Sequence, residues 1–135
     1  MNAIDQKSPE SRTFVRLPVK LGISMSFIGK INGTETEHKL LGHIDNISDE
    51  GICIRVKNLT PDVEEVLSKG ENILDIGFQI PMPDLRVAAK GKVVWIRQKG
   101  SKKFLGVQLI DLDEETQKKI FHYILNEIVK DNLEQ

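Results

Sequence analysis

Every second residue is apolar in several short segments of this chain, and this alternation constrains the fold more than any other feature. Residues 19–27 show it most clearly, and the pattern is typical of a β-strand with one buried face. Similar patterns follow at short spacing over residues 38–47, 52–56, 73–80, 86–97 and 104–110. Asn32-Gly33 and residues 99–102 mark turns between successive strands. We therefore expect about six antiparallel strands in a small barrel.

Two helices are expected among these strands. Thr60-Pro61 is typical of a helix start, because threonine caps free backbone N–H groups and proline suits the first helical position, and Gly70 is expected to end this short helix. A second helix is expected from about residue 113 to residue 130. Its apolar residues recur at helical spacing, at Ile120, Phe121, Ile124, Leu125 and Ile128. The fold class is therefore all-β with a short inserted helix and a C-terminal α-helix, packed over an open end or side of the barrel.

Charge, hydropathy and cysteine content exclude several classes of protein. The net charge of −1 argues against a protein that coats nucleic acid or an anionic membrane, since those partners call for a basic excess. No apolar run reaches transmembrane length, and residues 1–10 lack the apolar segment of a secretion signal. The single cysteine, Cys53, excludes an intrachain disulfide. We expect a cytoplasmic protein with no membrane insertion and no DNA or RNA partner.

Two arginines precede the first strand pattern. Arg12 and Arg16 lie four residues apart, and a planar guanidinium can hold a phosphate or a guanine edge through two hydrogen bonds. Pro18 disfavours helix in the residue before it, so residues 12–18 are expected to form an extended arm. By itself this spacing is common and indicates no function.

A polar segment lies between the second and third strand patterns. Asn46 offers an amide, Ser48 offers a hydroxyl that can donate to a phosphate oxygen, and Gly51 allows a ligand to approach the backbone closely. We interpret residues 46–51 as a polar turn. Such a string is just as typical of a purely structural turn between strands, so the residues alone leave both interpretations open.

The two segments together indicate a protein family much more specifically than either does alone. Arg12-Thr-Phe-Val-Arg16, followed by Asn46-Ile-Ser48-Asp-Glu-Gly51, resembles the RxxxR and [D/N]xSxxG signature of the PilZ domain family. The likeness continues through Gly91-Lys-Val-Val-Trp95-Ile-Arg97 and through the segment from Phe104 to Asp113, and covers roughly residues 12–128. It implies a PilZ domain over residues 12–135 after a flexible leader at 1–11, with a six-stranded barrel over about residues 19–111.

The resemblance also implies a ligand, the bacterial second messenger cyclic di-GMP, and a set of residues that bind it. Arg12 and Arg16 would bind guanine edges and phosphates, while Asn46, Ser48 and Gly51 would form the barrel side of the site. Trp95 and Arg97 are possible additional contacts on a shared strand face; packing and solvent exposure are their more ordinary roles. Ser11 stands where some family members have a further arginine and bind a stacked pair of nucleotides, which favours one ligand molecule per chain.

The function implied by the resemblance is a receptor that changes conformation on binding cyclic di-GMP. It would signal to an unidentified protein partner in motility, adhesion or exopolysaccharide and biofilm control, with no cofactor. The alternative is a PilZ-type adaptor that binds protein partners without nucleotide. An enzyme is not expected, because the sequence shows neither an acid–base pair nor metal-ligand spacing around its histidines, His38, His43 and His122.

Overall fold

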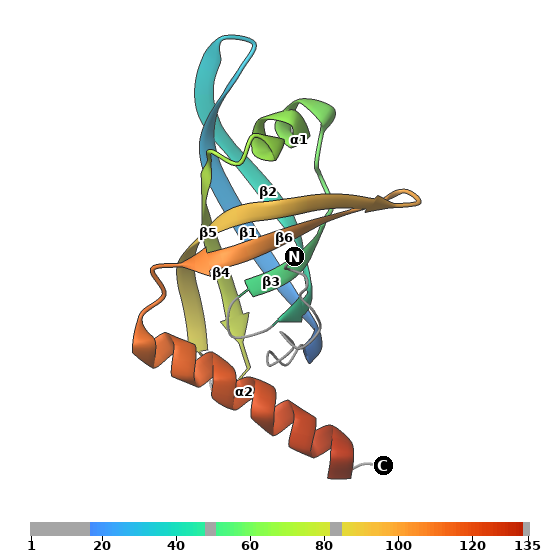
Figure 1. The fold of residues 1–135 in the computed structure, drawn as a ribbon, viewed down its shortest axis with the longest axis vertical. Helices are drawn as coiled ribbons and strands as arrows, with labels where there is room; N and C mark the ends of the chain where they lie inside the picture. Colours follow the sequence, from blue (N-terminus) through green and yellow to red (C-terminus); the bar gives the residue numbers. More distant parts are fainter. Residues whose placement is uncertain (1–16, 48–50, 82–84, 134–135) are drawn as a thin grey trace, which may run out of the picture.

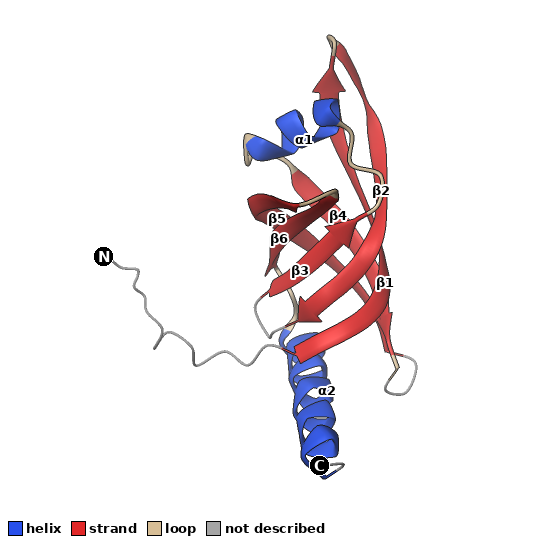
Figure 2. Cartoon of the chain, turned by 90° about the vertical axis from the view of Figure 1, so that its right-hand side faces the viewer, coloured by secondary structure: helices blue, strands red, loops and turns tan. Residues whose placement is uncertain are grey.

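The computed structural model describes residues 17–47, 51–81 and 85–133. The elements are, in chain order, β1 (Leu17–Ile31), β2 (Thr34–Ile47), β3 (Gly51–Val56), α1 (Pro61–Ser68), β4 (Ile73–Ile80), β5 (Leu85–Lys99), β6 (Lys102–Ile110) and α2 (Glu114–Leu133) (Figure 1). The strands close into an antiparallel barrel in the order β1-β2-β3-β6-β5-β4 (Figure 2). The predicted fold class is therefore confirmed.

The barrel interior is filled by the apolar half of each alternating strand. In β1, for example, Ile23, Met25 and Phe27 are buried, as the period of two predicts. The alternation in β2 is less regular because a bulge between Ile44 and Asn46 inserts one residue against β3. After this bulge the next buried side chain is Ile47, three residues beyond Ile44.

The hairpin between β1 and β2 is longer than predicted. β2 begins at Thr34, whereas the sequence pattern begins at residue 38. Asn32 and Gly33 both have positive φ, of 54° and 80°, as a two-residue hairpin turn requires. Backbone pairing therefore starts directly after the turn, in a segment whose side chains are exposed and show no alternation.

The two helices lie at opposite ends of the barrel (Figure 1). The Thr60 hydroxyl accepts a hydrogen bond from the Val63 amide at 3.4 Å, and Gly70 has a φ of 71° just after the helix, so α1 begins and ends as predicted. In α2, Ile120 and Ile124 are buried, whereas Val129 is 54% exposed. The apolar positions of α2 thus divide between core and surface.

The start of the barrel corrects the predicted arm. Leu17 and Pro18 are not part of an arm, because they pair with Ile47 and Asn46 as the first residues of β1. Proline is tolerated there because it lies at the beginning of a strand, next to a register shift between Pro18 and Leu21. The remaining arm residues, 12–16, lie outside the described residues.

Neither described helix has the length and apolar character needed to cross a membrane.

Candidate functional site

Four residues line up across the outer face of the barrel. Asn46 pairs with Cys53, Cys53 with Gly106, and Gly106 with Trp95, so one continuous row crosses β2, β3, β6 and β5. We call these four residues the outer row. Their chain neighbours Ile47, Ile52, Ile54, Leu105 and Val107 are buried in the core. Because successive residues of a strand point to opposite faces, the outer row faces away from the interior.

Trp95 owes its position in the row to Gly106. A Cβ atom at Gly106 would overlap the indole ring, so the ring lies directly against the backbone of β6. The Arg97 guanidinium lies 4.3 Å from the centre of the Trp95 ring, a cation–π contact between two residues on the same face of β5. Trp95 is therefore a half-buried side chain of the barrel surface and not a core residue.

Asn46 and Gly51 frame one end of the outer row. Asn46 is a half-buried residue near the end of β2, and Gly51 opens β3 beside Gln108 of β6. The predicted polar turn over residues 46–51 is thus wrong in extent, since its first two residues and its last residue belong to strands. A Cβ atom at Gly51 would lie 2.7 Å from the Val107 carbonyl oxygen. The close approach of β3 to β6 therefore requires glycine there whether or not a ligand is bound.

The structure brings together only part of the predicted site. Asn46, Gly51, Trp95 and Arg97 lie on or next to the outer row, whereas Ser48, Arg12 and Arg16 lie outside the described residues. Both arginines precede Leu17 in the sequence, and β1 enters the barrel at Leu17 and Pro18, which pair with Ile47 and Asn46. The chain thus enters the barrel beside the Asn46 end of the row.

Two residues of this surface were not singled out from the sequence. Gly106 is one of them, and a glycine within an apolar strand does indicate a close backbone approach. The other is Arg55, which lies two residues after Cys53 and pairs with Phe104, the partner of Arg97. Residues two apart in a strand lie on the same face, so the spacing of Arg55 from Cys53 could have identified it from the sequence.

Positive charge predominates on three of the four strands that the outer row crosses, whereas β2 contributes the exposed Asp45 next to Asn46. The segments that form β3, β5 and β6 contain no aspartate or glutamate, while they carry several lysines and arginines. Within the described ranges, no three His, Cys, Asp or Glu side chains gather as a metal site would require. The chemistry that this surface offers is hydrogen bonding, stacking on an indole ring and attraction for negative charge.

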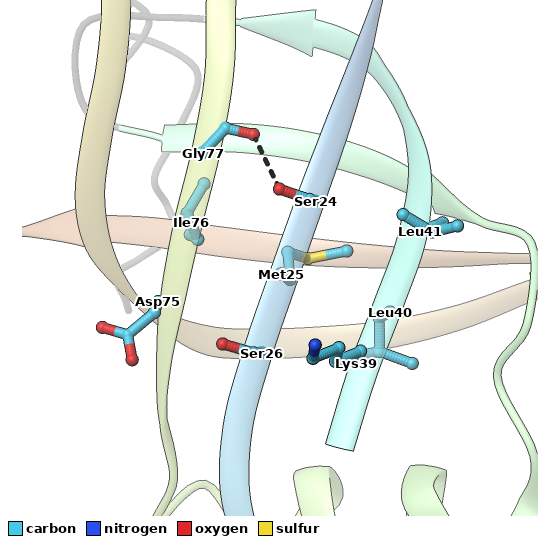
Figure 3. Close-up of a pocket in the computed structure, with 9 residues that line it drawn as sticks. All are labelled: Ser24, Met25, Ser26, Lys39, Leu40, Leu41, Asp75, Ile76 and Gly77. Atoms are coloured by element: carbon cyan, nitrogen blue, oxygen red, sulfur yellow. Dashed lines mark hydrogen bonds between the residues drawn. The ribbon is translucent and has the colours of Figure 1, made fainter. Parts of the chain in front are cut away.

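A shallow hollow of about 400 Å³ lies elsewhere on the outer surface, over β2, β1 and β4 (Figure 3). It exists because Ser24, Ser26 and Gly77 are small; the Ser24 hydroxyl donates to the Gly77 carbonyl at 3.5 Å. Asp75 at its rim forms an ion pair of 2.7 Å with Lys90. None of the residues predicted to bind a ligand lines this hollow.

Several solved structures have the same fold. The PilZ domain of YcgR from Escherichia coli, solved with c-di-GMP, is 11% identical with a TM-score of 0.62, covering 90% of this chain and 96% of that chain. Bacillus subtilis inhibitor of motility (MotI/DgrA) is 17% identical with a TM-score of 0.64, covering 88% of this chain and 52% of that one. The K. pneumonia MrkH–c-di-GMP complex is 13% identical with a TM-score of 0.61, covering 92% and 55%.

The chain spans about half the length of the Bacillus and Klebsiella proteins. At these identities the likeness establishes the fold alone. No curated protein matches the sequence. The family model described as PilZ domain, however, matches residues 10–126, which is most of the chain and includes both signature segments. With a closed six-stranded barrel, a short inserted helix and a C-terminal helix, the chain belongs to the PilZ domain family.

Proposed function

We propose that this chain is a bacterial receptor for cyclic di-GMP. The observation that carries the proposal is the position of the signature: Asn46 and Gly51 lie on adjacent strands, and β1 enters beside Asn46 directly after the signature arginines. Two structures of the same fold, those of YcgR and MrkH, were solved with c-di-GMP. PilZ domain proteins are binding and effector proteins rather than enzymes, and we propose the same for this chain.

The proposed site has a barrel side and a chain-entry side. Asn46, Ser48 and Gly51 would contact a guanine and the ring of phosphates and sugars from the barrel. Arg12 and Arg16 would bind guanine edges and phosphates, because a guanidinium can make two hydrogen bonds to either group. The absence of acidic residues from β3, β5 and β6 supports binding of a ligand with two phosphates.

The outer row adds a further contact surface. Trp95 lies flat against Gly106, and its ring is held by Arg97 at 4.3 Å from the ring centre. A guanine placed beside Asn46 would lie along the same face as this indole. Trp95 would therefore be a secondary contact that stacks on the guanine, and Arg97 a secondary contact that attracts a phosphate.

Binding would act as a switch. A ligand that contacts both residues 12–16 and the barrel stabilises the arrangement in which the two are joined, and it shifts the protein only by its preference for that state. The joined state would be recognised by a protein partner in the cytoplasm that controls motility, adhesion or exopolysaccharide and biofilm formation. No cofactor is needed for such a receptor.

Isothermal titration calorimetry with cyclic di-GMP tests the proposal. The Arg12→Ala/Arg16→Ala variant should bind at least about a hundredfold more weakly than wild type, since it loses two or more charge-assisted hydrogen bonds of about 1.5–3 kcal/mol each. Arg86→Ala is the matched control, because Arg86 is an exposed arginine that pairs with Gln79 away from the outer row. This control should bind as wild type does.

Fluorescence of Trp95, the only tryptophan, provides a second readout of the same titration. Absence of heat from the wild-type protein would overturn the receptor function and leave the nucleotide-free adaptor as the better description. Chromatography of the nucleotide after incubation provides the test for hydrolysis, and an intact ligand is the expected result.

A further inference from the structure

Four cationic side chains gather on the outer face of β3, β5 and β6, around the half-buried ring of Phe104. They are Arg55, Arg97, Lys99 and Lys102, all exposed, and we call this set the basic band. Arg55 and Arg97 pair with Phe104 from its two sides. Lys99 pairs directly with Lys102 at the end of the hairpin. The band is therefore one continuous surface built by strand register.

The charges of the basic band are not neutralised by the part of the protein that the structure describes. The ion pairs found there involve Lys90, Lys103 and Lys119, none of which belongs to the band. Like charges directly opposite each other on paired strands destabilise a sheet, and Lys99 faces Lys102 in this way. Such an arrangement is relieved when a negatively charged partner covers it.

The band extends well beyond the proposed nucleotide site. β5 pairs with β4 only as far as Lys92, and β6 pairs with β3 only as far as Lys103, so the end of the β5–β6 hairpin projects from the barrel (Figure 1). Gln108, the partner of Gly51, lies about 20 Å along β6 from Lys102 at roughly 3.3 Å per residue. A nucleotide bound beside Gly51 would leave the hairpin end of the band uncovered.

We propose that the basic band is a docking surface for an acidic segment of a protein partner. The partner's carboxylates would pair with the lysines and arginines, and Phe104 would supply an apolar contact at the centre of the patch. The inference rests on the proposed function in one respect: it names the surface through which the proposed receptor would reach its partner.

Other occupants fit the charges less well. A second copy of the chain in a symmetric contact would place the same cations against each other, which repels. The basic band would also attract a nucleic acid or an anionic membrane, but these partners are extended and would face the acidic residues outside the band as well, in a chain whose net charge is −1. A short acidic segment interacts mainly with the local charges, because screening limits longer-range repulsion to about 8 Å at physiological salt.

Fluorescence anisotropy with a fluorescein-labelled oligo-glutamate peptide tests this inference. The Lys99→Glu/Lys102→Glu variant should bind the peptide about tenfold more weakly than wild type. The matched control is Lys30→Glu/Lys39→Glu, which changes the net charge equally at two exposed lysines of β1 and β2. This control should bind the peptide as wild type does, and thermal melting establishes that both variants are folded.

Three results would overturn the proposal. They are an absence of peptide binding by wild type, equal weakening in the two variants, and tighter binding of a DNA duplex or of phosphatidylserine vesicles than of the peptide. Calorimetry with cyclic di-GMP on the same variants separates this inference from the proposed function. Lys99 and Lys102 lie four residues from Trp95 and Gly106, about 13 Å along the strands. The hairpin variant should therefore keep wild-type nucleotide affinity even when peptide binding is lost.

Discussion

The outer surface over β2, β1 and β4 differs from the one over β3, β6 and β5, although both consist of the alternate residues that the core does not use. The first surface contains the hollow, and the Asp75 carboxylate at its rim is paired with Lys90. The second surface has no acidic residue in its strands and carries an indole ring held against Gly106. The proposed binding surface is thus marked by unbalanced charge and a half-buried ring, and the hollow, although concave, has neither.

A glycine-to-alanine substitution should change the stability of the protein most where Trp95 packs on Gly106. Gly106→Ala should lower the free energy of unfolding by about 1–3 kcal/mol, because the added methyl group forces the indole or β6 to move. Denaturant unfolding measures this loss. The fluorescence of the single tryptophan should shift to longer wavelength as the ring becomes more exposed to water.

Gly77→Ala is the matched substitution on the other surface. A Cβ atom at Gly77 would meet only the Ser24 hydroxyl, at an ordinary contact distance of 3.5 Å. Stability should stay equal or rise by up to about 0.5–1 kcal/mol, since alanine restricts the unfolded chain more than glycine does. Equal losses for the two alanine variants would show that the surfaces do not differ in packing.

A smaller effect is expected from the ion pair beside the hollow. Asp75→Asn breaks the ion pair with Lys90. The Lys90 side chain is 58% exposed and the Asp75 side chain is 63% exposed, so the loss of unfolding free energy should stay below about 1 kcal/mol. Nucleotide affinity should not change. Glu64→Gln is the comparison, because the Lys103–Glu64 pair is less exposed and its loss should cost more. A marked fall in nucleotide affinity for Asp75→Asn would move the proposed site toward the hollow.

The smallest effect concerns the cap of α2, which is remote from the outer row. The Asp113 carboxylate accepts hydrogen bonds from the Thr116 amide at 2.7 Å and the Thr116 hydroxyl at 3.0 Å, and these hold the pKa of Asp113 below its ordinary value of 3.8. The stabilisation is therefore fully present above pH 3.8 and is lost as the pH falls through the lowered pKa of the folded state.

Chemical unfolding at a series of acidic pH values measures this loss. Asp113→Asn should reduce the fall in stability below pH 3.8, because the substituted side chain does not titrate. Thr60→Ala removes the neutral cap of α1 and should lower stability equally at every pH in the series. A wild-type profile identical to that of Asp113→Asn would mean that the cap contributes nothing through its charge.

The sequence by itself determined the elements and the family. The alternation predicted β4 with its observed ends, Ile73 and Ile80, and Thr60-Pro61 predicted the start of α1. These features are local, since strand period and helix capping depend on residues a few positions apart. The RxxxR and [D/N]xSxxG segments predicted the PilZ family, which the match over residues 10–126 confirms. The roles in binding of all the predicted site residues stay predictions; these residues are Arg12, Arg16, Asn46, Ser48, Gly51, Trp95 and Arg97.

Only the tertiary structure decided which surfaces these elements form. β3 lies beside β6 and not beside the next strand in the chain, and this order brings Cys53, Gly106 and Trp95 into one row. The bulge between Val93 and Trp95 shifts the register of β5, which no alternation reveals. Local periodicity specifies which face of a strand is apolar, but the pairing of distant strands depends on how all the buried side chains pack together.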